Sequence, residues 1–183
     1  MKVKLNNNHK KGINMKTNII AISALLALSS TAALAANQTL QANINGFAEP
    51  TITENAALHF GQIRLDVGST CTMDNAGAVS GDCDASDANI QIGDISVTGL
   101  APTSAMNITV SGGTGTNLTF VPVATATDGT TTQVTTDGVA SAFTTDASAT
   151  DIALTVYGEM EVDNALTAST AYTVDYIVDV SFQ

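Results

Sequence analysis

Residues 172–182 read YTVDYIVDVSF, and this stretch decides the fold of the chain. Every second position is apolar or aromatic, and most of the positions between them are polar or acidic. Successive side chains of a β-strand point to opposite faces of the sheet, so this alternation indicates a strand with one buried face. The residues expected on that face are Tyr172, Val174, Tyr176, Val178, Val180 and Phe182.

The same period of two recurs upstream, and no window shows the 3.6-residue period of a helix. The clearest runs are 39–48, 57–67, 89–100, 106–110 and 152–156. Asp-Gly and Gly-Gly pairs at 112–113, 128–129 and 137–138 mark turns between them. Leu118 and Phe120 begin a further short strand, placed at a sheet edge because Pro122 cannot donate a backbone hydrogen bond. This spacing predicts about eight to ten short strands in an antiparallel sandwich or barrel.

The first 35 residues have the pattern of an export signal. The apolar run Ile19–Leu28 is too short to span a bilayer, and Ala33-Leu34-Ala35 after it is a typical cleavage site. Met15, followed by Lys16, is a second possible start. We expect an exported protein that begins at Ala36, passes through the periplasm and reaches the cell surface. It would carry an N-terminal strand at 36–50 and one domain at 51–183, with no membrane span.

The exported part of the chain is strongly acidic. All 17 Asp and Glu residues follow Ala35, whereas Arg64 is the only Lys or Arg there, so its net charge is 1 − 17 = −16. Such a surface repels phosphate backbones and anionic lipid, which excludes nucleic-acid partners and membrane-surface binding. The charge is explained by solubility, or by an affinity for cations or basic partners.

Two cysteines, Cys71 and Cys83, are expected to form a disulfide in an oxidising compartment. They would close a hairpin whose turn is 74–77, and they would contribute about 3 kcal/mol by limiting the unfolded chain.

Few residues suggest chemistry. His59 is the only histidine after residue 35, and no nucleophile motif accompanies it, so we expect no enzyme and no cofactor. Asp82, Asp84 and Asp87 are weak candidates for Ca²⁺, because the glycine and closing glutamate of a calcium loop are missing. No firm metal site is expected.

Two stretches resemble a known family. Leu58-His59-Phe60-Gly61-Gln62-Ile63 is similar to the L-x-F-G-x-I strand of a secreted, pilin-like bacterial family of unknown function. Residues 154–182 resemble the terminal hairpin of that family and the last strand of chaperone–usher fimbrial (pilus) subunits, with Phe182 as the aromatic next to last. The sequence departs from those pilins at Thr170 and Ala171, where they usually carry a glycine, and in its local pair of cysteines.

The resemblance implies an immunoglobulin-like β-sandwich that accepts a strand from a neighbouring subunit. Residues 39–48 would be the donor strand, with side chains that fill the neighbour's groove. The donor candidates are Leu40, Ala42, Ile44, Gly46 and Ala48, with Gly46 where the two backbones approach closely. The terminal strand, 172–182, would border the acceptor groove. A periplasmic chaperone and an outer-membrane usher are the implied partners, besides other copies of the chain.

The pattern leaves open whether residues 39–48 complete a neighbour's sheet or the protein's own. The leading hypothesis is a structural subunit of an extracellular filament, a pilus, fimbria or biofilm fibre involved in cell adhesion. The alternative is a secreted, monomeric, adhesin-like binding module, with Ca²⁺ as a possible stabiliser. A hydrolase built on His59 is the third hypothesis.

Overall fold

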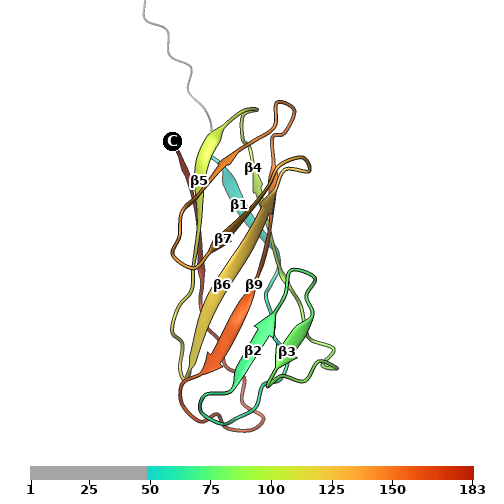
Figure 1. The fold of residues 1–183 in the computed structure, drawn as a ribbon, viewed down its shortest axis with the longest axis vertical. Helices are drawn as coiled ribbons and strands as arrows, with labels where there is room; N and C mark the ends of the chain where they lie inside the picture. Colours follow the sequence, from blue (N-terminus) through green and yellow to red (C-terminus); the bar gives the residue numbers. More distant parts are fainter. Residues whose placement is uncertain (1–48) are drawn as a thin grey trace, which may run out of the picture. The chain divides into compact units, whose positions relative to one another are not determined.

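The computed structural model describes residues 49–183, and in this range every regular element is a β-strand. The chain is all-β, as the alternation predicts. The strands are β1 (Thr51–Ala56), β2 (Thr70–Met73), β3 (Val79–Gly81), β4 (Gly93–Thr98), β5 (Ala105–Ser111), β6 (Leu118–Thr127), β7 (Thr132–Thr136), β8 (Ser141–Thr144), β9 (Ile152–Val162) and β10 (Ile177–Phe182) (Figure 1).

The strands form two antiparallel sheets. The larger sheet is built on β9, which pairs with β6 along its whole length on one side. On its other side β9 pairs with β4 and then with β2, and these continue to β1 and β3 respectively. β7 extends the sheet beyond β6. The smaller sheet has the order β10-β5-β8.

The two sheets pack face to face over one apolar core, so the fold is a β-sandwich. Along β4, β5, β6 and β9 buried residues alternate with partly or fully exposed ones, which is the pattern of strands with one face inward. The centre of the core contains Val97, Met106, Ile108, Leu154 and Val156, each at most 1% exposed. Replacing such a side chain by alanine typically costs about 2–5 kcal/mol.

β6 is an interior strand, so its sequence-based placement at a sheet edge is wrong. Pro122 is buried opposite Gly158 of β9. Two residues earlier, the amide of Phe120 donates to Gly113, on the side away from β9. Since the amides of residues two apart point the same way, the nitrogen of Pro122 also faces that side. On that side β7 ends at Thr136, opposite Val123, so no described strand lies beside Pro122 there. The proline therefore does not need to donate a backbone hydrogen bond.

Residues 57–67 do not form the strand that their alternation predicts. Within residues 49–183 they form only single β-bridges, His59 with Gln91 and Ile63 with Cys83. Gly61 has a positive φ of 74°, and a Cβ there would lie 2.9 Å from Ile90. The apolar residues of this stretch therefore cover the core as an irregular segment, in which Phe60 is buried.

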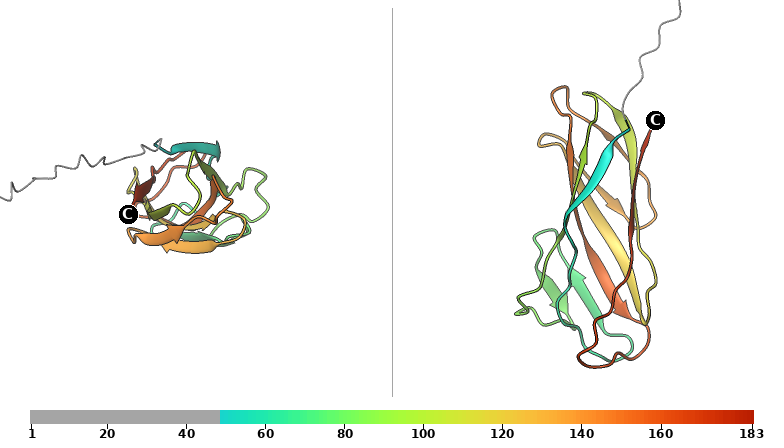
Figure 2. Two further views of the ribbon diagram at one scale, coloured as in Figure 1. Left: turned by 90° about the horizontal axis from the view of Figure 1, so that it is seen from above. Right: turned by 180° about the vertical axis from the view of Figure 1, so that it is seen from behind.

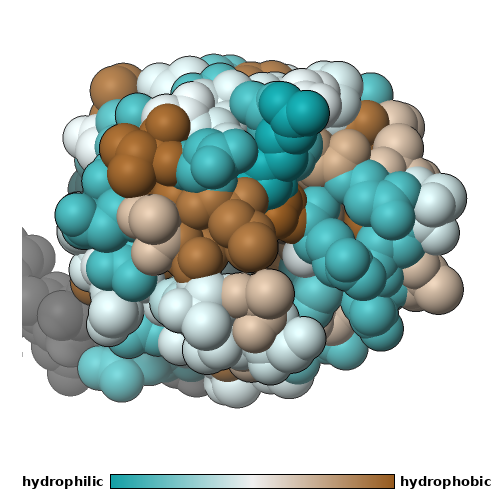
Figure 3. All heavy atoms as spheres, turned by 90° about the horizontal axis from the view of Figure 1, so that it is seen from below, coloured by the Kyte–Doolittle hydropathy of each residue, from teal (hydrophilic) through white to brown (hydrophobic). Residues whose placement is uncertain are grey.

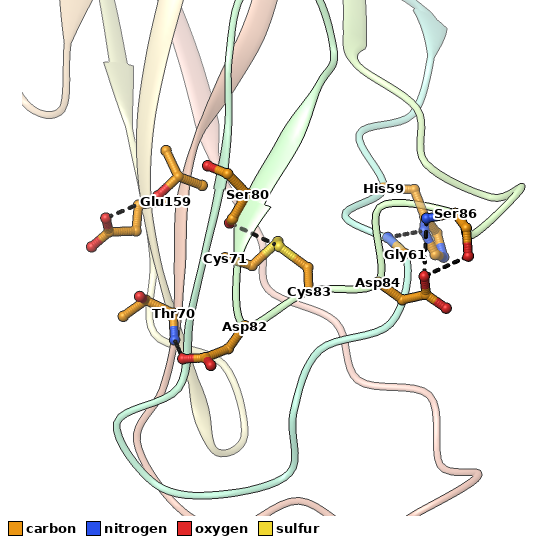
Figure 4. The surroundings of a disulfide bond; sticks show 11 residues. His59, Gly61, Thr70, Cys71, Ser80, Asp82, Cys83, Asp84, Ser86 and Glu159 are labelled. Carbon is orange, nitrogen blue, oxygen red and sulfur yellow. Dashed lines mark hydrogen bonds between the residues drawn. A yellow bond between two sulfur atoms is a disulfide. The ribbon is translucent and has the colours of Figure 1, made fainter.

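The disulfide between Cys71 and Cys83 is present, with an S–S distance of 2.06 Å and 5.3 Å between the Cα atoms. It joins β2 to the residues just after β3, as predicted for a cysteine-closed hairpin (Figure 4). The turn is held by Asp74, whose Oδ1 accepts hydrogen bonds from the amides of Ala76 and Ala78.

Candidate strand-acceptor site

One side of the sandwich is closed by the chain itself. The turn between β7 and β8 crosses from one sheet to the other, and Gly138 donates its amide hydrogen to Val110 of β5. Thr135 is buried there, and its hydroxyl donates to the carbonyl of Val139 at 2.6 Å. No free strand position remains between the sheets on that side.

The opposite side is open. Among the strands of residues 49–183, β1 pairs only with β4 and β10 only with β5, so no described strand lies beside the other edge of either one. No Cα atom of β1 lies within 8 Å of a Cα atom of β10, whereas hydrogen-bonded neighbours are about 4.8 Å apart. In Figure 2 the two strands border the opening from opposite sheets. β1 and β10 are thus too far apart to be hydrogen-bonded to each other.

At the two edges, apolar side chains that face inward are less buried than the core residues opposite them. Ile52 of β1 lies opposite the fully buried Val97, so it points toward the core, yet it is 44% exposed. On β10 the inward side chains pack against the core and are only partly buried, although their partners on β5 are buried. These inward residues are Val178, Val180 and Phe182. We call this opening, bordered by Thr51–Ala56 and residues 174–182, the acceptor groove.

The six residues expected on one face of the terminal strand do share it, because burial alternates through the whole of 172–182. The hydrogen-bonded strand covers only its second half, however. β5 ends at Ser111, opposite Ile177, and the chain then turns away through Gly112. Residues 173–175 instead lie against Gly113 and Gly115, where a Cβ would be 2.7 Å from the Asp175 carbonyl and 2.5 Å from that of Thr173.

An aromatic row crosses the sandwich beneath the groove. Phe60 meets Phe120 edge to face with 5.6 Å between ring centroids, and Phe120 meets Tyr176 in the same way at 5.9 Å. Burial raises the pKa of Tyr176, and the negative charge of Glu54 on β1 raises it further. The phenol of Tyr176 therefore stays neutral at physiological pH.

The three candidate calcium ligands are engaged in local contacts. Asp82 accepts a hydrogen bond from Thr70 N at 3.3 Å, and Asp84 holds the turn at Ser86 (Figure 4). Asp82 also lies 3.5 Å from Arg64, and Asp87 holds the turn at Asn89. Hydrogen bonds to Ser86 lower the pKa of Asp84. Within residues 49–183 no group of three or more His, Cys, Asp or Glu side chains is arranged to hold a metal ion.

His59 is exposed, as its place in the sequence suggests, and its Nδ1 accepts the amide hydrogen of Gly61 at 2.9 Å. This bond fixes the ring within its own turn. The arrangement explains the histidine as a part of the loop and supplies no activated nucleophile.

The leader, at 1–35, and the donor candidates Leu40, Ala42, Ile44, Gly46 and Ala48 lie outside the described residues. In the described part of the chain, no segment forms a helix that could cross a membrane. Comparisons of the chain with protein families, curated proteins and solved structures find no match.

The sequence predicts only one of the two borders of the groove. The alternation of 172–182 predicts one border. It does not predict β1 as the other border, because Thr51–Ala56 is mostly polar and has only two apolar side chains. The inward positions of β1 are Ile52 and Glu54, opposite the buried Val97 and Ile95, so Ile52 is the one apolar signal on that face.

Proposed function

We propose that the protein is a structural subunit of an extracellular filament, in which residues 39–48 of one copy fill the acceptor groove of the next. The observation that carries this proposal is the open side of the sandwich. Beside β1 and β10 no further described strand lies on this side, their Cα atoms are more than 8 Å apart, and the inward side chains Ile52, Val178 and Val180 keep part of their surface exposed. Strand edges of this kind pair readily with a further strand.

The donor segment matches the groove in length and pattern. If it runs antiparallel to β10, its five apolar positions meet the five inward positions of 174–182 one for one. The pairs are Leu40 with Phe182, Ala42 with Val180, Ile44 with Val178, Gly46 with Tyr176 and Ala48 with Val174. In this register the residue without a side chain meets the largest side chain of the groove, which fits the space that Tyr176 already occupies.

The connection to β1 favours a donor from another copy. To fill its own groove beside β1, the segment would have to reverse direction over Glu49-Pro50. Tight two-residue hairpin turns need a positive φ at the first central residue and often at both, which glutamate disfavours and proline cannot adopt. The reversed strand would also run parallel to β10, in a protein whose described strand pairs are all antiparallel.

Exchange of this strand produces an open chain of subunits. The groove of one copy and the segment of the next are different surfaces, so the contact is head to tail and leaves a free groove and a free segment at the two ends. Such a contact extends into a filament. The export signal, the partners implied by the resemblance, a periplasmic chaperone and an outer-membrane usher, and a role in adhesion at the cell surface all belong to this proposal.

The test compares the full-length exported protein with its Ile44→Asp and Asn45→Asp variants by size-exclusion chromatography and electron microscopy. We expect the first variant to be monomeric, because a carboxylate would enter the apolar groove. The matched control, Asn45→Asp, places the same charge on the opposite face of the strand and should assemble like the unmodified protein.

A second step shows that the groove is vacant in the monomer. A synthetic peptide with the sequence of residues 36–49 should raise the melting temperature of the Ile44→Asp protein, and the same peptide with aspartate at position 44 should not. If the unmodified protein is always monomeric, the filament proposal is wrong and the secreted binding module replaces it. If Ile44→Asp destabilises that monomer, the segment completes its own sheet.

A further inference from the structure

The two ends of the sandwich differ in their surfaces. The proximal end, where β1 begins, also contains the turns 99–104, 128–131 and 145–151. The distal end contains the segments 62–69, 112–117 and 163–171, and Figure 3 shows it with apolar atoms gathered near its centre. Two apolar side chains of the distal end are freely accessible, Leu65 at 41% and Val67 at 63%.

The distal segments are fixed to the rest of the domain, so these side chains are presented on a defined surface. Leu65 accepts a hydrogen bond from the amide of Leu166, and Gly68 donates to Val162 at the end of β9. Neither Leu65 nor Val67 contributes to the core cluster. A second copy that packs against these two side chains would remove apolar surface from water.

The length of the connection brings a second copy to this surface. In the proposed register Ala48 lies beside Val174, at the distal mouth of the acceptor groove, and β1 of the donor copy begins only three residues later, at Thr51. Three extended residues span about 10 Å. The proximal end of the donor copy must therefore touch the distal end of the acceptor copy.

The two ends carry opposite charges at one position, where Arg64 of the distal end would meet the acidic proximal end. The proximal end carries Glu49, Asp128, Asp146 and Asp151 and no Lys or Arg. The distal end carries Arg64, the only Lys or Arg after Lys16, with its side chain 72% exposed beside Asp82, and with Asp66 and Asp163 nearby in the same segments. The exposed ion pair to Asp82 is a weak one, and the five donors of the guanidinium allow a second carboxylate to bind.

We propose that Leu65, Val67 and Arg64 form a docking surface for the proximal end of the preceding copy, with Arg64 paired to Glu49 of the connection. This inference rests on the proposed strand exchange, and it adds a second contact that fixes the angle between consecutive subunits. Val67 and Leu65 lose their exposure in the filament, and Arg64 offsets part of the repulsion between two acidic ends.

Photo-crosslinking in the full-length protein tests the surface directly. One sample carries p-benzoyl-phenylalanine in place of Val67, and a second carries it in place of Ile177, which is 67% exposed beside the groove. We expect the Val67 probe to crosslink a second copy within residues 49–52, 99–104 or 145–151, and the Ile177 probe to crosslink residues 43–47. Peptide mapping by mass spectrometry identifies the sites.

The two probes separate the two proposals. A crosslink from Ile177 without an intermolecular crosslink from Val67 overturns the docking surface and leaves strand exchange standing. Absence of both overturns strand exchange and the docking surface with it. A Val67 crosslink that maps to another part of the second copy also overturns the proposed surface.

Charge reversal tests the pairing of Arg64. At low salt, Arg64→Glu should raise the protein concentration needed for half-maximal assembly about fivefold, the effect of one exposed ion pair. The double variant Arg64→Glu with Glu49→Arg should restore assembly. Asp94→Arg, on the middle of β4, changes the net charge without touching either end and serves as the control. Failure of the double variant to recover assembly contradicts the Arg64–Glu49 pair.

Discussion

Gly158 stands at the point where β9 changes partner, from β4 to β2. Its φ is 138°, and a Cβ at this position would lie 2.2 Å from the carbonyl oxygen of Val121. Both facts require glycine, because the clash is with backbone of an interior strand that cannot move aside. The single residue thus lets one long strand serve two neighbours in the same sheet.

Gly158→Ala is therefore expected to lower the free energy of unfolding by about 3 kcal/mol. Urea denaturation followed by circular dichroism measures the change. Gly129→Ala is the matched control, because Gly129 also has a positive φ, 89°, but its Cβ would meet nothing within 4 Å. It should cost about 1 kcal/mol, and equal losses in the two variants would contradict the steric explanation.

Asp128 orders the proximal turns through its carboxylate. One oxygen accepts the amides of Thr130 and Thr131, and the other accepts the amide of Asp146 at 2.6 Å. These hydrogen bonds lower the pKa of Asp128 below the ordinary aspartate value of 3.8, and the bond from the Thr131 amide has the largest effect. Because the pKa is lower in the folded state than in the unfolded state, the carboxylate stabilises the fold fully above the unfolded-state pKa. This stabilisation is lost as the pH falls through the folded-state pKa.

Asp128→Asn should accordingly reduce the melting temperature at pH 6, and the difference from the unmodified protein should shrink as the pH is lowered from 4 toward 2. Thermal melts over this range provide the measurement. The comparison is made between the two proteins at each pH, because protonation of other acids also relieves the general repulsion. A constant difference down to pH 2 would show that the carboxylate charge is not what holds these turns.

At the scale of the element, alternation predicted burial better than it predicted hydrogen bonding. Burial alternates along 172–182, and all of the expected side chains except Tyr172 pack against the core, whereas the ladder begins only at Ile177 because its partner β5 ends at Ser111. Residues 57–67 alternate equally well and form no strand. The period of the apolar residues predicts which side of the chain faces the core. Whether the chain forms a strand also depends on a hydrogen-bonding partner elsewhere in the sequence, which the period does not identify.

β6 shows the same limit from the other direction. Pro122 would mark an edge strand if each strand had neighbours along its full length. β7 reaches only as far as Val123, so the proline occupies a position that has a neighbour on one side alone. The short length of β7 leaves Pro122 without a neighbour on that side. The turn that ends β7 lies more than ten residues from the proline in the sequence.

The donor register can be tested at the element scale through Gly46 and Tyr176. Gly46→Leu should weaken assembly at least about tenfold, because the new side chain would overlap the Tyr176 ring. Adding Tyr176→Ala should recover part of this loss by opening space, at a cost in monomer stability. Asn45→Leu, which places the same leucine side chain on the other face, should have little effect. Analytical ultracentrifugation gives the association constants, and a register shifted by two residues would remove the compensation.

At the scale of the whole molecule, charge opposes assembly. Beyond residue 35 the chain has a net charge of −16, so consecutive subunits repel each other. We expect assembly of the full-length protein to strengthen between 10 mM and 150 mM NaCl, because the Debye length falls from about 30 Å to about 8 Å. Light scattering follows the change. The melting temperature of the Ile44→Asp monomer should depend less on salt, and assembly that weakens with salt would contradict this account.

The pairing of β1 with β4 also determines how the protein transmits tension. β1 is held to β4 from Thr51 to Ala56, and β4 is held in turn to β9 at the centre of the larger sheet. A pull on the chain before Glu49 acts along the axis of β1, so its hydrogen bonds are loaded in shear and share the force. They would have to break together, whereas a strand peeled from its end yields one bond at a time. The same alignment would apply to a donor strand beside β10, so each junction of the proposed filament would be strongest along the line of its subunits.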